Sequence, residues 1–216
     1  MLFQGNEMID RVEIGRKIRE QNAGPVEALS CKQFNLKQVG GSRTKVDGQH
    51  IVDGTRWSIK NAASRSTQVH LTTKRKFTAD FQLNELQAEF VNKFFGDQSF
   101  NHMDRNRYKM DEISPTAVDS FKSFLEANRD EFIRYVVCGK DDIQYVVYNG
   151  SVMSTESIME RCRNTNWSYN NTAIHLKDPD GKTFFHIQMK GSGKGTTYHG
   201  VLCHIHEHLF NQKETK

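Results

Sequence analysis

The sequence predicts an α+β fold with a mixed central sheet flanked by helices, followed by a β-rich half. Two observations predict it. In the first half, stretches with apolar residues at helical spacing surround short β-branched runs, and in the last third alternating runs are separated by turn residues. The chain has 216 residues, and we expect two domains over 6–105 and 106–216. The first five residues resemble the remnant of a cleavable tag and are left out of the fold prediction.

The first half is expected to begin with two helices. An amphipathic helix over 8–21 ends at the break Asn22-Ala23-Gly24-Pro25, and a second helix runs from Pro25 to about Leu36, because proline suits a first helical turn. Three apolar residues of the second helix are expected to face the core: Val26, Leu29 and Phe34.

Three strands are predicted next, over 45–53, 56–62 and 67–72. Asp53-Gly54 is a turn signal, so the first two strands form a hairpin. A helix over 81–95 follows, because apolar residues recur there every three or four positions: Leu83, Leu86, Phe90 and Phe94.

The second half is expected to start with a helix over 116–128, which buries Val118, Phe121 and Leu125. Strands over 132–137 and 144–148 are predicted to form a hairpin through residues 139–142, and a short helix follows over 155–163. Three alternating runs complete the chain as antiparallel sheet: 172–177, 183–190 and 198–206.

Composition places the chain among folded proteins, since 36% of residues are hydrophobic and 26% are charged. No apolar run approaches the roughly 20 residues needed to span a bilayer, and no secretory signal is recognised, so we expect a cytoplasmic protein without membrane contact. The four cysteines are far apart and form no CxxC pair, which is typical of reduced thiols.

Basic residues are concentrated early in the chain. Eight lie between residues 43 and 76, against only Asp47 and Asp53. This distribution favours binding of a polyanion near an acidic site, although a solvated charged face has the same pattern. The eight are Arg43, Lys45, Arg56, Lys60, Arg65, Lys74, Arg75 and Lys76.

Asp47 and Lys60 are the strongest candidates for chemistry, because a hairpin brings an early acid close to a later lysine. Mg²⁺ takes hard oxygen ligands and keeps several waters, so few carboxylates suffice to bind it. A lysine beside such a metal orients water and offsets phosphate charge. Three further residues are expected to assist: Glu27, the carbonyl of Ile59, and Gln68.

Each of these residues also has a structural explanation. Asp47 suits a turn before Gly48, Lys60 suits a strand edge, and Glu27 suits the start of a helix. A second acid–lysine pattern, Asp180 followed by Gln188 and Lys190, ranks below the first, because Asp178-Pro179-Asp180-Gly181 is an ordinary hairpin turn and no helical glutamate precedes it.

Histidines near the C-terminus indicate a less favoured zinc site. In a strand, His204, His206 and His208 share one face and Cys203 faces the other way, whereas structural zinc sites usually have four ligands in recognisable pairs. Contact with DNA phosphates or solvent is the favoured interpretation. Several polar residues suit base recognition: Arg161, Arg163, Asn170, Asn171, Gln188, Lys190, Lys194 and Tyr198.

Over residues 25–75 the chain resembles the PD-(D/E)xK nuclease superfamily, and within it a type II restriction endonuclease of the HhaI kind. The resemblance lies in Glu27, Gly40-Gly41, Asp47, Ser58-Ile59-Lys60 and Ser66-Thr67-Gln68. It implies that Asp47 binds the metal, Lys60 activates water and Glu27 assists. Ser58 departs from the pattern, which has an acidic residue at this position.

The resemblance implies sequence-specific, Mg²⁺-dependent cleavage of double-stranded DNA by a monomer or homodimer, with a catalytic domain over 6–105 and a recognition domain over 106–216. A non-catalytic DNA-binding module with a degenerate nuclease core, and a repair or homing nuclease, remain as alternatives. The residues expected to contact DNA are Arg43, Lys45, Arg65, Lys74, Arg75, Arg161, Arg163, Gln188, Lys190, Lys194, Tyr198 and His199.

Overall fold

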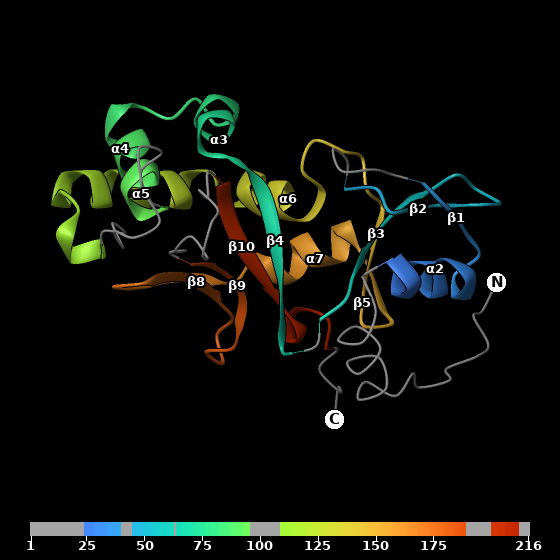
Figure 1. The fold of residues 1–216 in the computed structure, drawn as a ribbon. Helices are drawn as coiled ribbons and strands as arrows, with labels where there is room; N and C mark the ends of the chain where they lie inside the picture. Colours follow the sequence, from blue (N-terminus) through green and yellow to red (C-terminus); the bar gives the residue numbers. More distant parts are fainter. Residues whose placement is uncertain (1–23, 40–44, 63, 96–108, 189–199, 212–216) are drawn as a thin grey trace.

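The computed structural model describes residues 24–39, 45–62, 64–95, 109–188 and 200–211. They form an α+β structure of two five-stranded sheets with helices around and between them (Figure 1), which confirms the predicted fold class. None of the helices in these ranges is long and apolar enough to cross a membrane.

The first sheet is mixed and has the order β1-β2-β3-β5-β6. β3 pairs in parallel with β5, and the other neighbours pair antiparallel. Its strands are β1 (Leu36–Gln38), β2 (Gly48–His50), β3 (Arg56–Lys60), β5 (Tyr145–Tyr148) and β6 (Ser151–Ser154). The central strand β3 therefore joins the predicted early hairpin to a strand that lies more than eighty residues later.

The second sheet is antiparallel and has the order β4-β10-β9-β8-β7. Its strands are β4 (Ser66–Thr73), β10 (Gly200–His206), β9 (Thr183–Gln188), β8 (Ala173–Lys177) and β7 (Asn166–Asn170). Both sheets thus contain strands from before and after residue 105, and the boundary expected there does not separate one sheet from the other.

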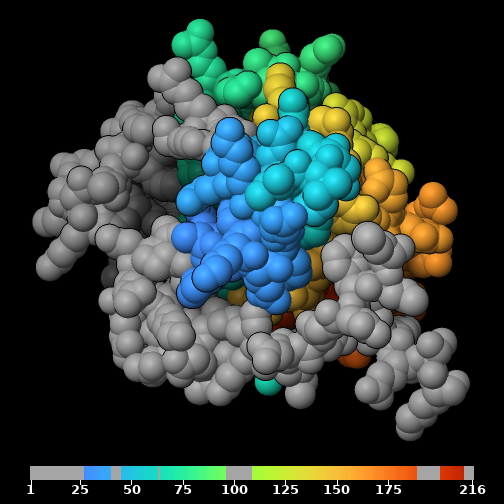
Figure 2. Space-filling view, turned by 90° about the vertical axis from the view of Figure 1, so that its right-hand side faces the viewer, coloured from blue at the N-terminus to red at the C-terminus, as the bar shows by residue number. Residues whose placement is uncertain are grey.

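The helices surround these sheets. They are α2 (Gly24–Gln33), α3 (Lys74–Asp80), α4 (Glu85–Phe94), α5 (Pro115–Ala127), α6 (Arg129–Cys138) and α7 (Thr155–Cys162), with short 3-10 turns at Met110–Glu112 and Glu207–Leu209. α6 contacts β4 of the second sheet and α7 contacts β6 of the first, so this helix pair connects the two sheets. Figure 2 shows α2 together with the β1–β2 region on one face of the molecule.

Two hydrophobic clusters hold these layers together. The larger contains residues of α3 to α7 and of both sheets, including the stacked rings of Phe90 and Phe121. The smaller lies around α2 and the first sheet, and consists of Cys31, Leu36, Trp57, Ile59 and Val147. The first sheet is therefore covered on both faces, which fixes which residues of β3 point to each side.

Several predicted elements are confirmed with small shifts of their ends. The helix expected over 116–128 is α5, with Pro115 in its first turn and Val118, Phe121 and Leu125 buried. The early hairpin is also confirmed, with Gly54 at a positive φ of 73° in its turn. α2 ends at Gln33, and Leu29 is 58% exposed, so the expectation that Leu29 faces the core is wrong.

Other elements differ from the prediction. Residues 132–137 form part of the helix α6 and not a strand, because nearly every side chain of this run is buried and a short apolar run does not distinguish the two periods. Gly139, expected in a hairpin, ends that helix at φ 66°. The helix expected from residue 81 begins at Glu85 behind an Asn84–Gln87 capping box, and Leu86 is 41% exposed. The helix expected over 8–21 lies outside the described residues.

Candidate active site

Asp47 lies at the centre of a polar cluster at the edge of β3. Its Oδ2 atom accepts hydrogen bonds from the Ser58 hydroxyl at 3.1 Å and the Ile59 amide at 2.6 Å, and it lies 3.3 Å from Lys60 Nζ. The Asp47 and Lys60 side chains are 20% and 16% exposed, so solvent reaches both. The structure therefore brings together the acid and the lysine that the sequence singles out.

The hairpin register explains this proximity. Gly48 pairs with Trp57 across the β2–β3 ladder, and the Asp47 amide donates to the Trp57 carbonyl at 2.9 Å, so Asp47 lies beside Ser58. Side chains alternate along a strand, so Ser58 and Lys60 share a face of β3 while Trp57 and Ile59 face the α2 cluster. Gly48 is required for this packing, since an added Cβ would lie 2.9 Å from a Leu36 methyl carbon.

Glu27 belongs electrostatically to the same cluster. The pKa of this carboxyl is raised. Burial is the largest cause and the charge of Asp47 adds to it, while the charge of Lys60 acts in the opposite direction. Two carboxylates and one ammonium therefore share this corner, with Glu27 supplied by α2 and the other two groups by the hairpin. The nearby Cys31 thiol is buried, and its pKa is raised by that burial and by Asp47 and Glu27.

Ser58 is fully buried at 0% exposure, and its hydroxyl is directed at Asp47. A carboxylate at this position would be enclosed next to the Asp47 carboxylate, where two like charges repel each other strongly. The serine instead donates a hydrogen bond that, with the Ile59 amide, fixes one oxygen of Asp47. The departure of Ser58 from the nuclease pattern thus leaves Asp47 well oriented.

The oxygen donors at this site suit Mg²⁺, which prefers carboxylate and carbonyl ligands and retains waters. All three hydrogen bonds that Asp47 accepts end on its Oδ2 atom, and no described residue donates to Oδ1. Asp47 Oδ1, the Glu27 carboxylate and the Ile59 carbonyl are the groups that would hold the ion. Across the described ranges, no group of three or more His, Cys, Asp and Glu residues has the arrangement of a metal site, so main chain and water would complete this shell.

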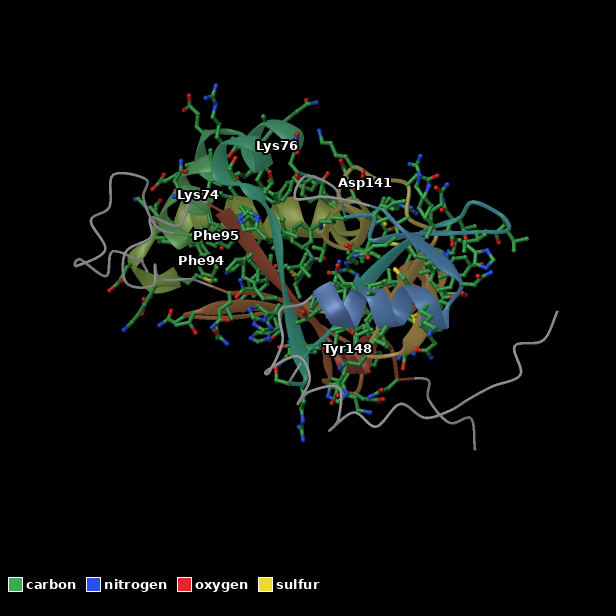
Figure 3. All side chains as sticks on the ribbon, turned by 45° about the vertical axis from the view of Figure 1, so that its right-hand side comes forward. Lys74, Lys76, Phe94, Phe95, Asp141 and Tyr148 are labelled. Carbon is green, nitrogen blue, oxygen red and sulfur yellow. The ribbon has the colours of Figure 1, made fainter. Side chains whose placement is uncertain are left out.

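Two lysines expected at DNA are instead enclosed by protein, which corrects those predictions. Lys45 Nζ donates to the carbonyls of Tyr135 and Val136 at the end of α6, at 3.1 and 2.7 Å. Burial, with a smaller contribution from Lys60, lowers the pKa of Lys45 to about 8. Lys74 is 1% exposed with Nζ 3.5 Å from the Asn92 carbonyl, and it lies near the α3 and α4 helices (Figure 3).

The other predicted DNA contacts occupy varied environments. Arg65 is 85% exposed and lies 4.0 Å from Glu207, and Arg75, Arg163 and Gln188 are exposed. Arg161 differs, because its guanidinium donates to the His208 carbonyl and stacks on Phe184 at 5.4 Å. Five residues of the DNA-contact prediction lie outside the described residues: Arg43, Lys190, Lys194, Tyr198 and His199.

Gln68 is exposed on β4 and lies opposite His204 of β10, in the second sheet. Its role beside Asp47 stays a prediction. In the rival pattern, Asp180 lies in the turn between β8 and β9, Gln188 ends β9, and Lys190 falls outside the described residues. Of the zinc candidates, His208 lies in the 3-10 turn after β10 and not on the strand face.

The sequence pattern singled out His204 and His206 but missed the two histidines that pack beside them. His175 on β8, His186 on β9, and His204 and His206 on β10 come together on one face of the second sheet. Two of them, His175 and His186, are distant in sequence from the C-terminal run. Alternation within each predicted strand was the available signal, but it identifies a cluster only when the strand order is known.

No protein-family model matches the chain, and no curated protein matches it either. Among solved structures, the chain is similar to the restriction endonuclease MspI in complex with its cognate DNA. The TM-score is 0.46 with 10% sequence identity, and the match covers 88% of this chain and 83% of that one. The residues of the candidate site are therefore assigned from their geometry in this chain.

Proposed function

We propose that this protein is a Mg²⁺-dependent endonuclease that hydrolyses phosphodiester bonds of double-stranded DNA at a short specific sequence. The observation that carries the proposal is the cluster of Asp47, Lys60 and Glu27, with the lysine ammonium 3.3 Å from the Asp47 carboxylate. Hydrolysis of a phosphodiester requires a positioned water and compensation of the charge that develops on the phosphate. A cluster with both carboxylates and an ammonium supplies groups for each.

Bound Mg²⁺ would supply a positive charge beside the phosphate and lower the pKa of a coordinated water. Asp47 holds its carboxylate in place through Ser58 and Ile59. Lys60, on the same face, offsets phosphate charge and orients the attacking water. Glu27 in its ionised form accepts a proton or a hydrogen bond from water, and its raised pKa favours that role near neutral pH.

A non-catalytic DNA-binding module does not require a lysine held against a partly exposed aspartate. The Asp47–Lys60 pair therefore favours the nuclease over that alternative. The discriminating test is incubation of unmethylated plasmid with protein and Mg²⁺, followed by gel electrophoresis. Discrete bands support a site-specific endonuclease, and smearing indicates a nonspecific nuclease. Binding in a gel shift without cleavage indicates the DNA-binding module. Addition of EDTA should stop cleavage and leave binding measurable.

The residue assignment has its own test. Lys60→Ala should reduce cleavage by about 10³-fold or more while DNA binding persists, because the variant removes the charge beside the scissile phosphate. Lys37→Ala is the matched control, since Lys37 is exposed on β1 of the same sheet and outside the cluster. Cleavage by Lys60→Ala at the rate of the Lys37 control would reject the assignment.

A further inference from the structure

The second sheet has one apolar and one polar face. Val69, Cys203, Ile205, Ile187 and Ile174 point into the main core. Strand alternation then places their neighbours on the opposite face. Those neighbours are Ser66, Gln68 and His70 on β4, His204 and His206 on β10, His186 and Gln188 on β9, His175 and Lys177 on β8, and Ser168 and Asn170 on β7. We call these residues the histidine face.

Four imidazoles pack closely at the centre of this face. His186 stacks on His204 with ring centroids 4.2 Å apart and planes inclined by 10°, and His175 lies 5.5 Å from His186. His186 Nδ1 lies 2.6 Å from His206 Nε2. Parallel rings direct their lone pairs side by side, so the stacked pair does not converge on a single metal ion.

Hydrogen bonds define where the protons of the neutral rings lie. Asn170 Oδ1 accepts from two backbone amides, so its amide nitrogen donates to His175 Nε2 and the His175 proton lies on Nδ1. His186 Nε2 donates to Gln188 Oε1 at 3.5 Å, which leaves His186 Nδ1 to accept from His206. His175 Nδ1 is buried and has no hydrogen-bond partner among the described residues.

The charges around the cluster have one sign. Burial is the largest cause that lowers the pKa of His175, His186 and His206, followed for His175 and His206 by the neighbouring histidines. Lys177 acts on His175, and His208 acts on His206, in the same direction. β4 adds one further titratable group to this face, His70, which lies two residues after Gln68. The other groups that β4 and β7 contribute are uncharged, and among the described residues no carboxylate raises these three pKa values.

An anion that approaches such a cluster raises the pKa of its imidazoles, because a nearby opposite charge favours their protonated form. Five strands about 4.8 Å apart span roughly 19 Å, which is wider than the major groove of about 12 Å. A face of this width is too wide to enter a groove and would lie across the sugar–phosphate backbone. The imidazole, amide and ammonium groups on it are donors suited to phosphate oxygens.

We propose that the histidine face binds backbone phosphates of duplex DNA and takes up protons as it does so. The inference rests on the proposed function for the identity of the polyanion, while the nuclease cluster itself is not needed for it. The face is thus a second contact surface, separate from the Asp47 cluster, whose affinity increases as the pH falls.

The test measures binding of a fluorescent duplex of about 20 base pairs by anisotropy, in EDTA, between pH 7.5 and 6.0. Uptake of about one proton changes the affinity by up to about tenfold per pH unit. We expect the affinity of the wild-type protein to rise at least about fivefold as the pH falls from 7.5 to 6.0. The slope of log affinity against log salt concentration should steepen by the equivalent of about one phosphate contact. The double variant His186→Gln/His206→Gln should show less than about a twofold change.

His50→Gln is the matched control, because His50 lies on β2 of the first sheet and pairs with Asp53 at 3.0 Å. Calorimetry of wild-type protein in two buffers of different ionisation enthalpy measures proton uptake without any variant, so misfolding of the double variant would not prevent the test. Equal pH dependence of wild type and a folded double variant, or no proton uptake by calorimetry, would overturn the proposal. Stoichiometric zinc binding that replaces the proton-linked binding would overturn it too.

The plasmid assay separates this inference from the proposed function. Proton-linked binding without Mg²⁺-dependent cleavage would reject the nuclease and keep the histidine face. Cleavage that persists while the double variant keeps the wild-type pH dependence would reject the histidine face alone.

Discussion

The two sheets of this protein hold their ionisable groups in opposite ways. In the first sheet, Asp47 and Lys60 form a partly exposed pair of opposite charge, joined electrostatically by Glu27. In the second sheet, five histidines and Lys177 share a face to which the described strands contribute no carboxylate. The first region is therefore organised before any ligand binds, whereas the histidines of the second are held in their neutral form and would gain charge beside an anion.

The largest effect should come from the first sheet. Asp47→Asn keeps the size of the side chain and removes its charge, so we expect cleavage of plasmid with Mg²⁺ to fall by about 10³-fold, equivalent to about 4 kcal/mol. The rate of supercoiled plasmid loss measures it. Asp119→Asn is the control, because Asp119 is 75% exposed on α5. A near-normal rate in Asp47→Asn would remove the basis of the comparison.

Lys45 is a lysine that supports the first sheet without taking part in its chemistry. Lys45→Met keeps the aliphatic stem and removes both bonds to the end of α6, so the free energy of unfolding should fall by about 2–3 kcal/mol. Urea denaturation measures this loss. Lys182→Met, at an exposed turn, should change stability by less than about 0.5 kcal/mol.

The histidines of the second sheet should make stability depend on pH. Burial lowers the pKa of His206 to about 4, from an ordinary value near 6.5. The folded state therefore binds fewer protons than the unfolded chain between these values, and stability is lost as the pH falls below about 6.5. Solvent screens a half-buried ring, so we expect a loss of about 1–2 kcal/mol between pH 7 and 4.5.

The measurement is urea denaturation at both pH values with wild-type protein and His206→Gln. The variant should lose less stability than wild type over the same interval, because glutamine does not titrate. A pH dependence unchanged by the substitution would show that other groups cause it.

The smallest effect should come from Ser58. Ser58→Ala removes one of the three donors to Asp47 and leaves the Ile59 amide in place, so the free energy of unfolding should fall by about 1 kcal/mol and cleavage by less than tenfold. Urea denaturation and the plasmid assay measure these effects. Ser58→Asp should be the worse substitution, since it encloses a second carboxylate beside Asp47. Higher stability of Ser58→Asp than of Ser58→Ala would contradict this view of the site.

The sequence was most informative where neighbours in the chain are neighbours in space. The Asp47–Lys60 pair follows from one hairpin, whose turn residues and alternation are local signals. The burial of Lys45 could not be predicted, because its partners Tyr135 and Val136 lie about ninety residues further along the chain. Residues 132–137 were expected to form a strand. They form part of α6, whose last carbonyls accept the hydrogen bonds of the Lys45 ammonium.

The histidine cluster shows the same limit. His175 and His186 come together with His204 through the order β10-β9-β8, which no local pattern specifies. β6 and β7 were missed because they are short and partly polar, and they were recognised only as partners of neighbouring strands. The α+β class was predictable from local periods, but the interleaving of the two sheets was not.

That interleaving has a consequence for synthesis. β3 in the first sheet pairs with β5, and β4, only a few residues after β3, pairs with β10 near residue 200. Contacts that span so much of the chain form late and slowly. A growing polypeptide emerging from the ribosome therefore holds Asp47 and Lys60 long before either sheet is complete, and the sheet that supports them is complete only after β5 and β6 have been made.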